Sequence, residues 1–166
     1  MYGKIFYFFG GKIIMNEKIW KIYLSGEIHS DWRDEIKNLC EEKALPVIIS
    51  SPNTTHEDSD DCGVNILGTE ADKFWHDHKG ASINSIRNST LLKSTDILIV
   101  KFGDKYRQWN AAFDAGTAKA LDKPIITLHE DNLNHALKEI NQSAVASCRS
   151  VSQVVQILSY VIKGDL

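Results

Sequence analysis

Residues 95–103 of this 166-residue chain read TDILIVKFG, and this stretch decides the fold. It is the clearest core strand in the sequence, because a continuous run of β-branched and apolar residues is bounded by turn-forming residues. Three further stretches have the same character: residues 19–25 (IWKIYLS), 45–51 (LPVIISS) and 123–129 (KPIITLH). Continuous apolar strands are typical of parallel sheets that are buried on both faces. The sequence therefore predicts four such strands.

Stretches with helical periodicity alternate with these strands. They are residues 31–44, 82–94, about 108–121, a short piece near 133–140, and 150–163. Alternation of this kind predicts an α/β fold, a doubly wound (flavodoxin- or Rossmann-like), mostly parallel sheet with helices on both faces. Right-handed crossovers then place the carboxyl ends of the strands at one edge, where such sheets bind their ligands.

The chain is predicted to form a single domain over residues 18–166, since 166 residues is about one domain long. Residues 1–17 are interpreted as an N-terminal extension or an extra strand. Their apolar run is interrupted by Gly10, Gly11 and Lys12, and it is far shorter than the ~20 residues that span a bilayer.

The amino-acid composition indicates which classes of binding partner and which cellular compartment to expect for this protein. The net charge is −3 with both signs interspersed, which argues against a surface for nucleic-acid polymers or anionic membranes. Three cysteines at irregular spacings, Cys40, Cys62 and Cys148, favour a reducing, cytoplasmic location over a disulfide framework.

Residues 53–80 are polar and rich in Asp and His. Loops of this length are usually functional or contain short helices, and we interpret the segment as a solvated lid. No spacing within it matches a known metal site, so no metal is predicted. No cofactor is predicted either, because neither a dinucleotide fingerprint nor a P-loop follows Gly103.

Two polar segments follow predicted strand ends: residues 23–32 and residues 102–121. In the second, helical spacing predicts an apolar stripe of Trp109, Ala112, Phe113, Gly116 and Ala120. Asn110 and Asp114 are four residues apart on a neighbouring face, so they can act on one object. From spacing alone, Asp114 as a solvated helix carboxylate is the simpler interpretation.

The stretches YLSGEIHSDWRDEI, HEDSDD…ILG and KFGDKYRQWNAAFDAGTAKALDKP resemble the YtoQ family, which is grouped with the nucleoside 2-deoxyribosyltransferases. The resemblance extends from Lys21 to Val161. In those enzymes a carboxylate on the helix after a core strand attacks the anomeric carbon, and Asp114 stands in the matching place. The family's usual residue there is Glu, which is one methylene longer.

The resemblance implies roles for other residues. Tyr23 corresponds to a tyrosine that supports the nucleophile, and Asp96 resembles an aspartate at the start of the core strand. Glu27 or Asp96 is the candidate acid or sugar-hydroxyl clamp. Each has a simpler alternative, because Asp96 can close a turn and Glu27 can pair with Arg33.

The remaining predicted contacts are with the substrate. Trp32 or Trp109 is a candidate to stack on the base, although the stripe favours a core position for Trp109. Asn110 is expected to hydrogen-bond the sugar or the base. Gly26 and Gly103, which follow the two strands, complete the substrate-binding set.

The resulting hypothesis is an enzyme that acts on the N-glycosidic bond of a nucleoside or nucleotide, by deoxyribosyl transfer or hydrolysis, through the Asp114 carboxylate. The alternative is a non-catalytic nucleotide- or metabolite-binding module of the same fold. A third interpretation is an oligomeric scaffold with a vestigial pocket. The resemblance also implies a homo-oligomer.

Overall fold

The structure is a computed structural model that describes residues 4–9, 12–105 and 107–164. Met1, Tyr2, Gly3, Gly10 and Gly11, which belong to the predicted N-terminal extension, lie outside the described residues. None of the described helices is both long and apolar enough to cross a membrane.

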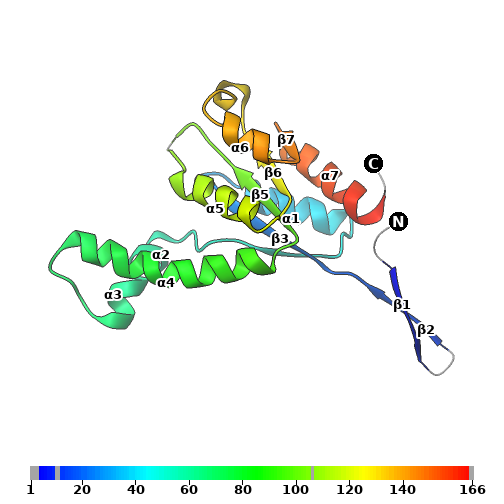
Figure 1. Cartoon of the computed structure of the whole chain (residues 1–166), viewed down its shortest axis with the longest axis horizontal. Coiled ribbons are helices and arrows are strands. Elements are labelled where there is room, and N and C mark those ends of the chain that lie inside the picture. The colour runs from blue at the N-terminus through cyan, green and yellow to red at the C-terminus, as the bar shows by residue number, and fades with distance from the viewer. Residues whose placement is uncertain (1–3, 10–11, 106, 165–166) are drawn as a thin grey trace.

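A five-stranded, all-parallel sheet forms the centre of the molecule, in the order β4-β3-β5-β6-β7 (Figure 1). The strands are β3 (Trp20–Gly26), β4 (Val47–Ser50), β5 (Ile97–Lys101), β6 (Ile125–Leu128) and β7 (Ala146–Cys148). The predicted α/β fold class is confirmed. The sequence missed β7, whose three residues include a serine and are too few to show a strand pattern.

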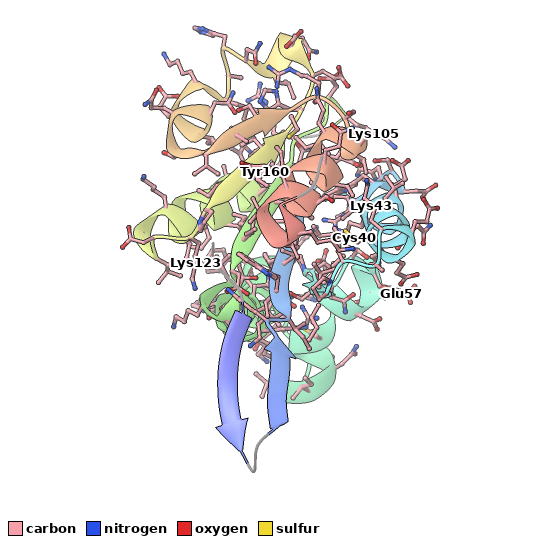
Figure 2. The ribbon with its side chains drawn as sticks, turned by 90° about the vertical axis from the view of Figure 1, so that its right-hand side faces the viewer. Cys40, Lys43, Glu57, Lys105, Lys123 and Tyr160 are labelled. Carbon is pink, nitrogen blue, oxygen red and sulfur yellow. The ribbon has the colours of Figure 1, made fainter. Side chains whose placement is uncertain are left out.

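Helices cover both faces of the sheet because alternate strand residues point to opposite sides. Helices α1 (Trp32–Glu42) and α7 (Val151–Lys163) pack on one face, where Ile22, Leu24 and Ile99 enter their core. Figure 2 shows these two helices beside each other, with Cys40 on α1 and Tyr160 on α7.

Tyr23 and Leu98 point to the opposite face. There the core is completed by α5 (Trp109–Ala120) and by the last turns of α4 (Lys73–Ser94). The 3₁₀ helix η1 (Asp131–Leu133) and helix α6 (Lys138–Ser143) lie between β6 and β7 in the chain and cover the same side.

The polar segment at residues 53–80 contains short helices, one of the two expectations for it, but the helix expected from about Ser82 begins earlier. The segment forms α2 (His56–Asp60), α3 (Cys62–Leu67) and the first two turns of α4, which starts nine residues earlier than predicted. Asp72 starts α4 by accepting a hydrogen bond from the Phe74 N–H at 2.7 Å. These helices pack on one another and project from the sheet (Figure 1).

Two glycines allow α4 to come close to α2 and α3. A Cβ at Gly63 would lie 2.4 Å from the backbone nitrogen of Gly80, and a Cβ at Gly80 would lie 2.6 Å from the carbonyl oxygen of Asp60. Backbone therefore packs against backbone at this crossing. The mixture of polar residues and glycines hides this packing from an analysis of hydrophobic periodicity.

An antiparallel hairpin precedes the domain. Strands β1 (Lys4–Phe9) and β2 (Lys12–Glu17) pair with each other, from Lys4 opposite Glu17 to Phe9 opposite Lys12. They form a two-stranded sheet separate from the central one, and the hairpin extends away from the body (Figure 1).

The end of β3 makes an unusually close backbone approach to β5. Gly26 has φ +110°, and a Cβ at this position would lie 2.0 Å from the carbonyl oxygen of Lys101. The same oxygen accepts a hydrogen bond from the Glu27 N–H at 3.0 Å. Gly26 therefore lets the chain turn while it remains tight against β5.

Replacing Gly26 with Ala should destabilise the protein by about 3 kcal/mol or more, because a positive φ and a clash with rigid backbone add together. Gly68→Ala is the matched control. Gly68 also has a positive φ, +90°, but a Cβ there would have nothing within 4 Å, so it should cost about 1 kcal/mol. Urea unfolding measures both values, and equal losses in the two variants would contradict the backbone clash.

Candidate functional site

Asp114 lies on α5 against the carboxyl end of β3. The Ser25 hydroxyl donates a hydrogen bond to Asp114 Oδ2 at 2.5 Å. Small residues make this approach possible, because Ala111, Ala115 and Ala118 are the α5 side chains buried against the sheet. Asp114 is thus not the solvated helix carboxylate of the simpler interpretation.

Asp114 is half-buried, and its charge is poorly compensated. Burial raises the pKa of the Asp114 carboxyl, and the hydrogen bond from Ser25 only partly opposes this. No cation among the described residues is a cause of this pKa shift. A carboxylate in these surroundings is less well solvated than one in water, which is the condition that a nucleophile needs.

Tyr23 lies two residues before Ser25 on the same face of β3 and is completely buried. Its hydroxyl has no hydrogen-bond partner among the described residues. Burial raises the pKa of the phenol, and the nearby Asp114 charge raises it further, against opposing effects of Arg87 and Arg33. Tyr23 is therefore a protonated donor close to Asp114 with an unused hydrogen bond.

Glu27 follows the turn at Gly26 and is 6% exposed. Its carboxylate accepts hydrogen bonds from the Ser30 hydroxyl at 2.5 Å and from the His29 N–H, and Lys101 Nζ lies 3.6 Å away. Burial alone would raise the pKa of Glu27, but these groups outweigh burial and hold it below its usual value. Glu27 is consequently an acceptor at neutral pH rather than a proton donor.

The predicted pairing of Glu27 with Arg33 takes place through the backbone. The Arg33 guanidinium donates to the carbonyl oxygen of Glu27 at 2.5 Å and to that of Gly26 at 3.0 Å. Gly103, on the neighbouring strand end, leaves room for Glu27, because a Cβ there would lie 2.8 Å from Glu27 Cγ. Gly26, Glu27 and Gly103 thus form one packed corner.

Asp96 does not join this site, because it lies at the amino-terminal end of β5, whereas the site lies at the carboxyl ends of the strands. It precedes β5 and accepts hydrogen bonds from the Lys21 N–H at 2.8 Å and from Lys18 Nζ at 2.9 Å. From Lys21 to Ser25 the strand rises about 13 Å. Partial burial raises the pKa of Asp96, but these hydrogen bonds and Lys18 lower it overall. The simpler alternative, a turn-closing aspartate, describes its contacts.

The two candidate stacking residues occupy positions opposite to those expected. Trp32 is buried in the core, where its indole N–H donates to the Glu27 carbonyl oxygen at 2.8 Å, so its ring is not accessible to a base. Trp109 is 69% exposed, so the predicted core position for Trp109 is wrong. The stripe that contains Trp109 faces solvent, because α5 packs on the sheet through its alanines. Asn110 is exposed one turn before Asp114.

Sequence reasoning overlooked two contributors to the site. Ser25 lies in the YLSGEIHSDWRDEI stretch, and its position two residues after Tyr23 in a strand places both side chains on one face of the sheet. Arg87 comes from α4, donates to the Ser51 carbonyl oxygen at 2.8 Å, and acts electrostatically on Tyr23. No local sequence signal connects Arg87 with β3.

A shallow hollow of about 400 Å³ lies at the carboxyl ends of β5 and β6. Lys101, Gly103, His129, Arg149 and the start of α7 contribute to its wall. It borders the Glu27 corner and does not include Asp114 or Tyr23. Among the described residues, no three His, Cys, Asp or Glu side chains are grouped as a metal ion requires.

Comparison with known proteins gives two sequence relationships. The sequence model of the family described as nucleoside 2-deoxyribosyltransferase YtoQ matches residues 23–162. A Bacillus subtilis (strain 168) protein named uncharacterized protein YtoQ is 39% identical over 144 residues, which cover 87% of this chain and 97% of the relative.

Two solved structures are similar at low sequence identity. A conserved protein from Enterococcus faecalis V583 has a TM-score of 0.58 and 14% identity, covering 87% of this chain and 99% of its own, and shares the fold. A 2-deoxyribosyltransferase from Bacillus psychrosaccharolyticus has a TM-score of 0.48 and 20% identity, covering 81% of this chain and 90% of its own.

The raised pKa of Asp114 predicts a pH-dependent gain in stability when the charge is removed. Asp114→Asn should raise the free energy of unfolding at pH 7 on the order of 1 kcal/mol. A carboxyl whose folded pKa is raised destabilises the fold above that pKa and costs nothing below its unfolded value of about 3.9. The gain should therefore vanish near pH 3.5. Urea unfolding at both pH values checks this, and a gain independent of pH would contradict it.

Proposed function

The chain belongs to the nucleoside 2-deoxyribosyltransferase YtoQ family, and from this premise we propose that it cleaves and transfers at the N-glycosidic bond of a nucleoside or nucleotide. The observation that carries the proposal is the Tyr23–Ser25–Asp114 cluster at the carboxyl ends of β3 and β5. This is the position where the strand order of the sheet reverses and where such sheets bind ligands.

In the proposed reaction Asp114 is the nucleophile. Breaking the bond between C1′ and the base nitrogen generates an oxocarbenium-like state, which an adjacent carboxylate stabilises and then traps as a C1′–O bond. The electron pair of the broken bond leaves with the base, which takes up a proton from solvent water, and the attacking base or water later returns a proton to solvent. A second base, or water, then attacks C1′ and releases Asp114, which gives transfer or hydrolysis.

Ser25 and Tyr23 prepare Asp114 for this role. The Ser25 hydroxyl fixes Oδ2, so that Oδ1 is directed at the sugar. The Tyr23 hydroxyl, which has no partner within the described fold, donates to the carboxylate or to the sugar ring oxygen when substrate fills the site. A buried donor that is left unpaired costs about 1–3 kcal/mol, and substrate binding recovers that energy at the reacting centre.

Glu27 is proposed as an acceptor for a sugar hydroxyl. Its lowered pKa suits a hydrogen-bond acceptor and not the acid that protonates the leaving base. Asn110, one turn before Asp114 on α5, is proposed to hydrogen-bond the sugar or the base. Asp96 has no part in this proposal, because it lies at the amino-terminal end of β5, away from the carboxyl ends of the strands. The proposed substrate is a small nucleoside or nucleotide, and the proposed reaction requires no cofactor. We also propose that the chain forms a homo-oligomer.

Base release and base exchange test the proposal directly. Purified protein is incubated with ribo- and deoxyribonucleosides and their monophosphates, and free bases are separated by chromatography. Asp114→Asn should reduce turnover by about 10³-fold or more. Asp77→Asn, an exposed carboxylate on α4, is the matched control and should leave turnover unchanged.

Three results would contradict parts of the proposal. Turnover that survives in Asp114→Asn would exclude Asp114 as the nucleophile. Stabilisation of the protein by one nucleoside without any turnover would favour the binding module. Neither turnover nor a thermal shift with any member of the panel would favour the scaffold.

Tyr23→Phe separates catalysis from stability. Because the Tyr23 hydroxyl makes no hydrogen bond within the described fold, its removal should leave the free energy of unfolding unchanged or slightly higher. Turnover should fall roughly 10²- to 10³-fold, as when other single preorganised donors are removed. Urea unfolding and the base-release assay are run on the same preparation. A loss of stability with unchanged turnover would show a structural tyrosine.

A further inference from the structure

The projecting helical segment presents a cluster of aromatic rings to solvent at the start of α4. Phe74 is 65% exposed and Trp75 is 53% exposed, and His78 is exposed one turn further along the helix. The centre of the Trp75 ring lies 5.1 Å from that of Phe74 and 5.6 Å from that of His78. The three rings therefore form one surface, which we call the aromatic tip.

The aromatic tip lies away from the packing within the segment. At about 100° per residue, Phe74, Trp75 and His78 lie on one side of α4 and Gly80 lies on another. Gly80 is the residue at which α4 meets the backbone of Asp60. Neither Phe74 nor Trp75 belongs to the hydrophobic core on either face of the sheet. Large aromatic side chains that a fold leaves exposed together typically mark an interaction surface.

The segment that carries the aromatic tip is strongly acidic. Residues 56–79 contain seven Asp and Glu residues and two Lys residues, which give a formal charge of −5, although the whole chain carries −3. The rest of the chain is therefore positive, by +2. One of the two lysines, Lys79, is paired with Glu70 at 2.5 Å. Asp72 and Asp77, which lie within two residues of the rings in sequence, are exposed.

This charge decides which class of partner fits the aromatic tip. Nucleic acids and anionic membranes would be repelled by it. A second copy that docked through its own aromatic tip would bring two negative segments together. A positively charged partner is favoured in two ways, because the carboxylates attract it and because the faces of Trp and Phe rings bind Arg and Lys through cation–π interactions.

We propose that the aromatic tip, formed by Phe74, Trp75 and His78, docks an Arg- or Lys-rich segment of another protein. Trp75 is the anchor, since a partly exposed Trp beside a second ring has the character of an interface hot spot. The 22 residues of α4 extend about 33 Å, and only its last turns pack on the sheet (Figure 1). A partner at the tip therefore leaves the Asp114 site open.

Binding of model peptides to the full chain tests the proposal. The probe is a fluorescein-labelled amphipathic peptide built from Leu and Arg. The control probe is the same peptide with Glu in place of each Arg. Fluorescence anisotropy should show binding of the Arg peptide that weakens as salt is added, because the attraction is between exposed charges. The Glu peptide should not bind.

Two variants locate the binding surface. Trp75→Ala should weaken binding of the Arg peptide roughly 30-fold, as for other hot-spot residues. Asp77→Lys should weaken it a few-fold, in keeping with an exposed ion pair. Tyr160→Ala is the matched control, since Tyr160 is an exposed aromatic residue on α7, on the body of the protein (Figure 2). It should leave binding unchanged, and circular dichroism checks folding in each variant.

Four outcomes would overturn the proposal. They are no binding of the Arg peptide to the wild type, equal binding of the two peptides, and unchanged binding in Trp75→Ala. The fourth is a lower sedimentation mass for Trp75→Ala than for the wild type, which would make the aromatic tip a contact between copies. None of these readouts depends on whether the protein turns over a nucleoside.

Discussion

The pairing of β3 with β5 is tightest at Gly26, and the arrangement of the candidate site depends on that contact. Gly26 packs against the carbonyl of Lys101 without a side chain between them, and the Glu27 N–H binds the same oxygen. This contact keeps the carboxyl ends of β3 and β5 paired side by side, with Gly26 opposite Lys101. Ser25 reaches α5 from one side of this corner, and Glu27 fills the space that Gly103 leaves. A wider separation of the strands would disconnect Asp114 from its hydroxyl partner.

The same region contains groups that do not favour folding. Within the described part of the chain, no cation lowers the pKa of the half-buried Asp114, and the fully buried Tyr23 hydroxyl has no hydrogen-bond partner. The sheet tolerates both because the strands around them are densely apolar, with residues from Ile97 to Val100 almost completely buried. The fold thus supplies the stability that the polar cluster lacks. This division between a stable sheet and a less stable site is common where a protein acts on a ligand.

Much of the fold could be predicted from the sequence, because the continuous apolar residues of β5 and β6 are typical of buried strands. The early start of α4 could not, since its first turns depend on Gly80 packing against α2 and α3 rather than on a hydrophobic stripe. The largest error concerned α5. Spacing correctly identified a stripe through Trp109 and Phe113, but periodicity cannot say which side of a helix meets the sheet when small residues occupy the other side.

For the site, the sequence and the family resemblance brought Tyr23 and Asp114 together, and the structure places them close to each other. The predicted positions of Asp96 and Trp32 were wrong. The resemblance provides residue types, but it does not show which residues lie at the carboxyl ends of the strands and remain accessible. Ser25 and Arg87 depend on contacts between distant segments, which no local pattern records.

The crossing of α3 and α4 has a consequence for how this protein can change over evolutionary time. At Gly63 and Gly80 any side chain would collide with opposing backbone, so neither site can drift by single substitutions that keep the present geometry. The two helices must diverge together or not at all. We therefore expect the projecting segment of α2, α3 and the start of α4 to be kept as one unit in related sequences. Substitutions in it should be found mainly at residues that face outward.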